Sequence, residues 1–93
     1  MSGAADEAAV PRLRRGVKFR HDPVRDAWVL LAPERLFQPD ATAVEVLKLV
    51  DGARTLGAII DDLAARFAAP RDLIAADVAA LLRDLGEKGA IEF

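Results

Sequence analysis

The chain has 93 residues, of which 53% are hydrophobic and 30% charged, and its formal net charge is −2. This composition predicts one globular domain, because a disordered chain lacks the apolar surface that offsets the entropy of ordering. No apolar run approaches the ~18–20 residues that span a bilayer, and no apolar signal segment stands at the N-terminus, so we expect a cytoplasmic protein.

The N-terminal residues carry no periodic apolar face. Residues 1–11, MSGAADEAAVP, are small and polar, so we predict a disordered tail or linker over residues 1–12 and a folded domain over residues 13–93. Charge is uneven along the chain: residues 21–93 have eight bases and thirteen acids, a balance of −5. Residues 12–20, here called the basic segment, hold five bases and no acid: Arg12, Arg14, Arg15, Lys18 and Arg20. This segment could touch phosphates, lead flexibly into the first strand, or dock on an acidic protein.

Three short strands are predicted next. GVKFRHD alternates apolar and basic residues, which is the period of a half-buried strand, and Asp22-Pro23 favours a turn into a second strand, AWVLL. Pro33 lacks an N–H and indicates a further turn into a short third strand, Glu34–Phe37. The strands should be antiparallel, with one apolar face against the helices that includes Val17, Phe19, Val29 and Leu31.

From Asp40 onward the apolar spacing is that of helices. Asp40 and Thr55 are suited to cap a first and a second helix, Gly52 to a left-handed helix end, and Pro70 to the first turn of a third helix. We expect helices of about 10–18 residues and a final extended piece, AIEF. The apolar stripes are Ala43, Val46, Leu47 and Val50; Leu56, Ile59, Ile60, Leu63 and Phe67; and Ile74, Val78, Leu81, Leu82 and Leu85. Strands followed by helices predict an α+β fold similar to a winged helix-turn-helix.

The sequence offers no evident catalytic or metal-binding set. It has no cysteine, tyrosine or asparagine, one serine in the N-terminal region, and one histidine, His21. These residues supply neither a nucleophile with its base nor the three or four nitrogen and sulfur ligands of a zinc site. We therefore expect a protein that is not an enzyme and that has no cofactor.

Two functional classes remain. The first is DNA binding, with the third helix as reader, but Arg71 and Arg83 there are outnumbered by acids at positions 72, 77, 84 and 87. The second is a peptide-binding module in which an extended segment adds to the open strand edge. The acidic third helix is no obstacle to this second class.

Three segments together resemble the PqqD family of pyrroloquinoline quinone biosynthesis. They are RRGVKFRHDPVRDAWVLLAPERLF, ATAVEVLKLVDGARTLGAIIDDLAARF and IAADVAALLRDLGEKGAIEF. The resemblance implies a non-catalytic peptide chaperone that binds the precursor peptide PqqA. Such a protein presents PqqA to the radical S-adenosylmethionine enzyme PqqE, which cross-links a glutamate and a tyrosine of the peptide. Some members of the family occur fused to the PqqC oxidase.

The resemblance also implies where the peptide lies. In related recognition domains the peptide is an added strand on the third strand, over a cleft bounded by the third helix. In this sequence the strand edge is Glu34, Arg35, Leu36 and Phe37, and the facing helix offers Arg71, Ile74, Asp77, Val78 and Leu81. The backbone of residues 34–37 would align the peptide, the apolar members would accept its side chains, and Arg35 and Arg71 would pair with its carboxylates.

Overall fold

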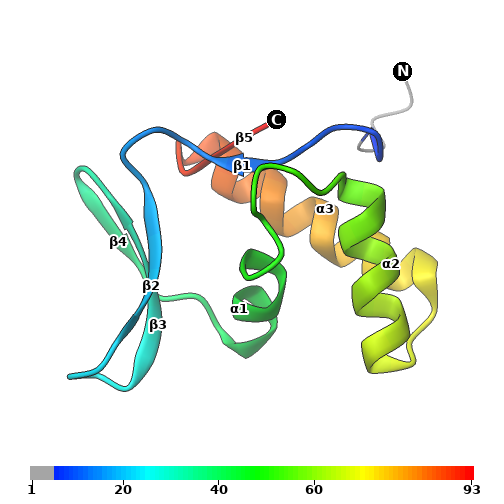
Figure 1. The fold of residues 1–93 in the computed structure, drawn as a ribbon, viewed down its shortest axis with the longest axis horizontal. Helices are drawn as coiled ribbons and strands as arrows, with labels where there is room; N and C mark the ends of the chain where they lie inside the picture. The colour runs from blue at the N-terminus through cyan, green and yellow to red at the C-terminus, as the bar shows by residue number, and fades with distance from the viewer. Residues whose placement is uncertain (1–5) are drawn as a thin grey trace.

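The fold combines one three-stranded antiparallel sheet with three helices, which confirms the predicted α+β class (Figure 1). The computed structural model describes residues 6–93. The sheet has the order β2-β3-β4, and a separate pair joins β1 to β5. In chain order the elements are β1 (Arg12–Leu13), β2 (Lys18–Asp22), β3 (Ala27–Ala32), β4 (Arg35–Phe37), α1 (Ala41–Leu47), α2 (Leu56–Phe67), α3 (Arg71–Glu87) and β5 (Ile91–Glu92).

The register of β2 and β3 decides which side chains face the helices. Phe19 lies opposite Leu30, which is fully buried in the core, whereas Val29 lies opposite the exposed Arg20. Because side chains alternate between the two faces of a sheet, Phe19 and Leu30 share one face, and Val29 and Leu31 share the other. The predicted single apolar face that joined Phe19 to Val29 and Leu31 is therefore wrong.

Local signals at the starts of α1 and α2 are confirmed. An oxygen of Asp40 accepts the Ala43 N–H at 2.8 Å, and the Thr55 hydroxyl accepts the Ala58 N–H at 3.1 Å. Gly52 is left-handed as predicted, with a φ of +78°, but it lies in the loop after α1 and not at the helix end, which is Leu47.

Helix α1 has 7 residues and is shorter than predicted. After Leu47 the chain tightens, because Leu49 and Val50 donate to carbonyls only three residues earlier, those of Val46 and Leu47. Val50 still reaches the core, with 8% of its surface exposed.

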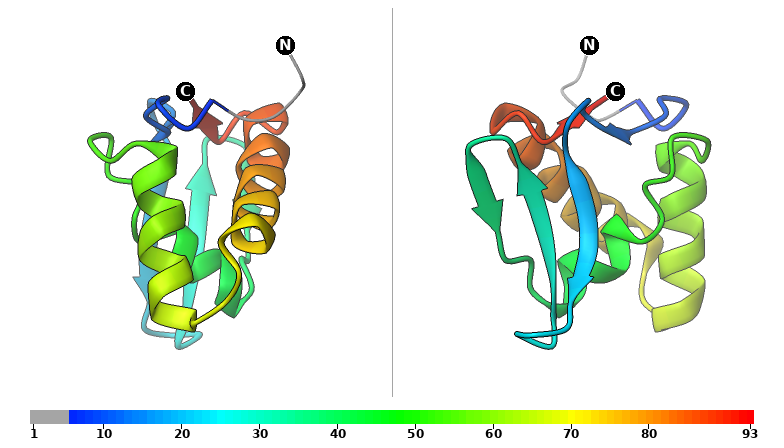
Figure 2. Two further views of the ribbon diagram at one scale, coloured as in Figure 1. Left: turned by 90° about the vertical axis from the view of Figure 1, so that its right-hand side faces the viewer. Right: turned by 60° about the vertical axis from the view of Figure 1, so that its left-hand side comes forward.

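One core joins the sheet to the helices. Leu30 of β3, Leu56 and Ile59 of α2, and Leu82 of α3 have no exposed surface. The ribbon shows the sheet on one side of the helices, with α2 and α3 side by side (Figures 1 and 2). Phe67 is an exception to the predicted α2 stripe: it is the last residue of the helix and remains 52% exposed.

The N-terminal segment differs from the predicted tail. The carbonyls of Glu7 and Ala9 accept the Gly57 and Leu56 N–H groups at 2.9 and 2.8 Å, which satisfies donors at the start of α2 that have no partner within the helix. Pro11 is fully buried, and β1 then pairs with β5. The expected disordered tail therefore does not extend over residues 6–12, while residues 1–5 lie outside the described residues. We call residues 6–11 the N-terminal strap.

A charged contact fixes the strap to α3. The Glu7 carboxylate accepts hydrogen bonds from two Arg71 nitrogens at 2.7 and 3.2 Å, and Arg71 Nε donates to Asp61 at 2.6 Å. The Arg71 hydrogen bonds hold the pKa of Glu7 below its usual value of 4.5. A carboxylate whose pKa is lowered by folding stabilises the folded state when the pH is above the usual pKa of the group. This contribution is lost as the pH falls through the folded-state pKa.

Replacing Glu7 with Gln should loosen the strap. We expect faster hydrogen exchange at the Leu56 and Gly57 amides, and a Tm lower by less than about 5 °C at pH 7, because exposed ion pairs contribute little to stability. The Tm difference from the wild type should shrink as pH falls below 4.5. Glu87→Gln is the control, since Glu87 has no ion pair within residues 6–93. Equal exchange rates in Glu7→Gln and the wild type would show that the contact does not hold the strap.

Candidate functional site

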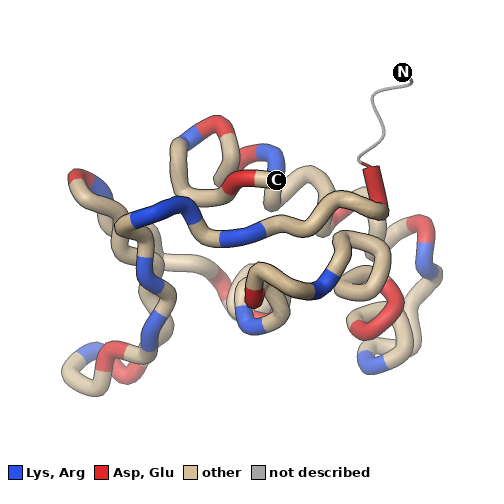
Figure 3. The backbone as a smooth tube through the Cα atoms, turned by 45° about the horizontal axis from the view of Figure 1, so that its top comes forward, with Lys and Arg blue, Asp and Glu red and all other residues tan. Residues whose placement is uncertain are grey.

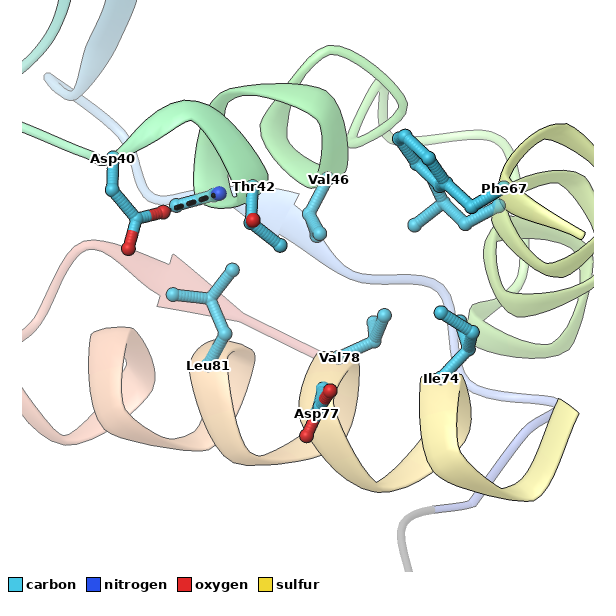
Figure 4. A pocket seen from close by; sticks show the side chains of 10 residues that line it. Asp40, Thr42, Val46, Phe67, Ile74, Asp77, Val78 and Leu81 are labelled. Atoms are coloured by element: carbon cyan, nitrogen blue, oxygen red, sulfur yellow. Dashed lines mark hydrogen bonds between the residues drawn. The ribbon is translucent and has the colours of Figure 1, made fainter. Parts of the chain in front are cut away.

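An apolar pocket lies between α1 and α3 and is closed at one end by the last residue of α2 (Figure 4). Its volume is about 180 Å³. Asp40 and Leu81 lie at one end, Phe67 and Ile74 at the other, with Val78 between them. The lining residues are Asp40, Thr42, Ala43, Val46, Leu63, Phe67, Ile74, Asp77, Val78 and Leu81.

Helical spacing on α3 builds one wall of this pocket. Ile74, Val78 and Leu81 recur at i, i+4 and i+7, so they lie on one face of the helix. Val78 is 3% exposed and belongs to the core, whereas Ile74 and Leu81 are half-buried at the edge of the core. The wall is therefore continuous with the core, and Val78 serves both.

Ion pairs hold the opposite wall in place. Arg66 near the end of α2 donates to Glu45 of α1 at 3.1 Å and to Asp62 at 2.8 Å. The hydrogen bond from Arg66 is the main reason that the pKa of Glu45 is lowered. The Arg66 guanidinium also lies 5.5 Å from the centre of the Phe67 ring. This contact between α1 and α2 positions Phe67 at the end of the pocket.

Strand β4 forms an open edge of the sheet. Among residues 6–93 it pairs only with β3, through Arg35, Leu36 and Phe37, and Leu36 is 45% exposed. The predicted strand began one residue too early, since Glu34 lies in the turn with Pro33. Only residues 38 and 39 separate β4 from Asp40 at one end of the pocket, so the strand edge and the pocket follow each other along the chain.

The structure brings together only part of the predicted site. Ile74, Asp77, Val78 and Leu81 share the pocket, while β4 lies outside its lining. Arg71 also lies outside it, with its guanidinium bonded to Glu7 and Asp61. The pocket residues absent from the prediction are Asp40, Thr42, Ala43, Val46, Leu63 and Phe67. Five of these appeared in the sequence only as a cap or as core positions, and nothing local indicated that they border a cavity.

Within residues 6–93 no group of three or more metal-ligating side chains comes together. In the same range no helix is long and apolar enough to cross a membrane.

The α+β fold agrees with the family that the sequence resembles, and known proteins match this chain in both sequence and structure. The family described as Coenzyme PQQ synthesis protein D (PqqD) matches residues 27–91. The chain belongs to the PqqD family. A PqqD relative from Bradyrhizobium diazoefficiens, named PqqA binding protein, is 50% identical over 86 residues, covering 92% of this chain and 84% of that protein. The family suggested by the three sequence segments is thus confirmed.

Solved structures of PqqD and of a related domain share the fold. The solution structure of the PqqD truncation of Methylobacterium extorquens PqqCD, described as a functional, stand-alone recognition element for ribosomally made peptides, has a TM-score of 0.79. It is 45% identical, and the match covers 100% of both chains. Lasso peptide synthetase B1 in complex with a leader peptide has a TM-score of 0.73 and 26% identity, covering 91% of this chain and 100% of that one. The first of these shows that a PqqD domain occurs as part of PqqCD, as the resemblance implied.

Two adjacent leucines on α3 differ in burial, because Leu82 lies in the core and Leu81 lines the pocket. Leu82 is fully buried, so Leu82→Ala should lower the free energy of unfolding by about 2–5 kcal/mol. Leu81 is half-buried, and Leu81→Ala should cost less than about 2 kcal/mol, since fewer contacts are lost. Urea denaturation of the two variants measures this difference. Equal losses would show that Leu81 is a core residue and not a pocket wall.

Proposed function

We propose that this protein binds the PqqA precursor peptide as a non-catalytic recognition domain and presents it to the radical S-adenosylmethionine enzyme PqqE. The observation that carries the proposal is the open edge of β4, which ends three residues before the first lining residue of an apolar pocket that the described side chains leave unfilled. The relative named PqqA binding protein and the leader-peptide complex of a domain with this fold support it.

The edge of β4 offers backbone groups to an extended peptide. An edge strand has unpaired N–H and C=O groups on one side, and an added strand can satisfy them. Arg35, Leu36 and Phe37 provide this edge. Leu36 projects from the strand and is exposed, so it can also contact a side chain of the added strand. In this account the backbone gives alignment, and selectivity comes from neighbouring side chains.

The pocket would accept one large apolar side chain of the peptide. Its volume of about 180 Å³ is comparable to the engineered cavities of about 150 Å³ that take up a benzene molecule. Ile74 and Leu81 are half-buried in the free protein, and a guest side chain would complete their burial. Each buried methylene group is worth about 0.8 kcal/mol, so a leucine or aromatic guest gains several such increments.

Helix α3 is unsuited to DNA. A phosphate-facing helix needs exposed cations, but one of the two arginines within α3, Arg71, is bonded to Glu7 and Asp61. The other, Arg83, shares the helix with four acids. The winged-helix DNA-binding alternative is therefore disfavoured.

Alternate backbone N-methylation of the peptide tests strand addition. In an added strand every second peptide amide donates to β4, and the amides between point away. N-methylation of the donating amides should weaken binding by about fivefold or more per site, because each net hydrogen bond is worth about 1 kcal/mol. Methylation at the intervening positions is the internal control and should have little effect. Fluorescence anisotropy with PqqA peptides methylated one position at a time gives the profile.

If the loss of affinity does not alternate between successive methylated positions, the peptide does not bind as an added strand. Absence of any binding by the unmodified PqqA peptide would contradict the proposed function as a whole.

The basic segment supplies a candidate surface for the partner enzyme. Its five side chains are exposed, and none has an ion pair among residues 6–93. The basic positions, blue in Figure 3, follow one another along one stretch of the backbone. None of the five lines the pocket, and β2 is the sheet edge opposite β4. A partner docked on this segment would leave the edge of β4 free for the peptide. We propose that PqqE contacts it through an acidic surface.

Charge reversal tests this assignment. Arg14→Glu with Arg15→Glu should weaken binding to PqqE by about tenfold or more at low salt and leave PqqA binding within about twofold. Arg83→Glu with Arg54→Glu is the charge-matched control and should change neither. The measurement is titration calorimetry with each partner in turn. Unchanged PqqE binding in the Arg14 and Arg15 variant would place the enzyme on another surface.

A further inference from the structure

The apolar pocket has an anionic rim. Of its ten lining residues, only Asp40 and Asp77 are charged, and both are acids. Asp40 projects from the start of α1 and Asp77 from the middle of α3, so the two carboxylates come from opposite sides of the pocket (Figure 4). The rim therefore has a formal charge of −2 with no cation in the lining.

Neither carboxylate is neutralised within the described residues. Asp77 has no hydrogen bond or ion pair among residues 6–93, and Asp40 is engaged only by the backbone N–H of Ala43, through one of its two oxygens. The nearby arginines are committed elsewhere: Arg66 is bonded to Glu45 and Asp62, and Arg71 to Glu7 and Asp61. Residues 6–93 thus offer no cation of their own to this rim.

A guest that fills the pocket changes the surroundings of these charges. A large side chain seated among Ile74, Val78 and Leu81 displaces water from the pocket and lowers the local dielectric. An unpaired carboxylate beside such a guest is then destabilised, whereas one that faces a cation is stabilised. The same rim therefore disfavours acidic peptide segments and favours basic ones.

We infer that the pocket selects a peptide segment in which a cation stands next to the large apolar side chain. The cation is a lysine or arginine side chain, or the amino terminus of the peptide, and it pairs with Asp77 and Asp40. This inference rests on the proposed function and deepens it, since it gives the chemical pattern that the pocket recognises. Asp77 and Asp40 are specificity-determining residues in this account.

Isosteric substitutions of the two acids test the pairing. Asp77→Asn removes the charge at constant shape, and Asp40→Asn does so while keeping a residue that caps a helix equally well. Binding of fluorescein-labelled PqqA peptide should weaken about 3- to 10-fold in each single variant, more in the double variant, and the salt dependence of binding should become shallower. Glu87→Gln, a charge loss on α3 outside the pocket, should leave the dissociation constant unchanged.

Altered peptides distinguish the two sources of the cation. One peptide has an acetylated amino terminus, and others replace each lysine or arginine with glutamine. The modification that removes the paired cation should weaken peptide binding to the wild type. It should change the affinity of the Asp77→Asn variant little, because that variant has already lost the pairing charge. Removing a cation that does not contact the rim should weaken peptide binding by the same factor in the wild type and in Asp77→Asn.

The outcomes separate this inference from the proposed function. Weakened binding in the Asp77 and Asp40 variants, with coupling to one peptide cation, supports the inference. Unchanged affinity and salt dependence in both variants, with tight binding by the wild type, overturns the inference and leaves the proposed function standing. Failure of the wild type to bind PqqA overturns both.

Discussion

The apolar stripe of α3 serves the core and the pocket at the same time. Val78, Leu82 and Leu85 are buried in the core, but Ile74 and Leu81 remain half-buried beside it. Because residues three and four apart lie on one face of a helix, the core and the pocket share this face. Core packing therefore fixes α3 in place, and with it the wall of the pocket that faces α1.

Exposed ion pairs support this arrangement at its edges. Glu7 holds the strap to Arg71 at the start of α3, and Arg66 joins the end of α2 to Glu45 of α1. Each contact is weak because both partners face water. Each lies at a helix end, however, where the core holds the chain least, so it adds order where local opening would begin. The pocket is thereby bounded by helices whose ends are tied down.

Local signals predicted where the helices begin. The features that the sequence did not predict depend on contacts between residues far apart in the chain. The caps at Asp40 and Thr55 depend on residues three positions away, so they could be identified without the fold. The two-residue strand β1 is too short for any periodicity, and the strap depends on donors at the start of α2, whereas β5 lies within the predicted extended piece AIEF. The pocket could not be predicted from local signals either. Phe67 has the spacing of a core residue, but it is the last residue of α2 and is therefore exposed.

In the proposed complex a peptide pairs with β4 and fills the pocket between α1 and α3. An amide NMR titration of the labelled protein with PqqA peptide, and separately with a DNA duplex, examines both contacts at once. We expect saturable peptide-induced shifts at Arg35–Phe37 and at the pocket residues of α1 and α3, and none from DNA at those positions. Peptide-induced shifts confined to the β2 edge, or saturable shifts from DNA alone, would contradict it.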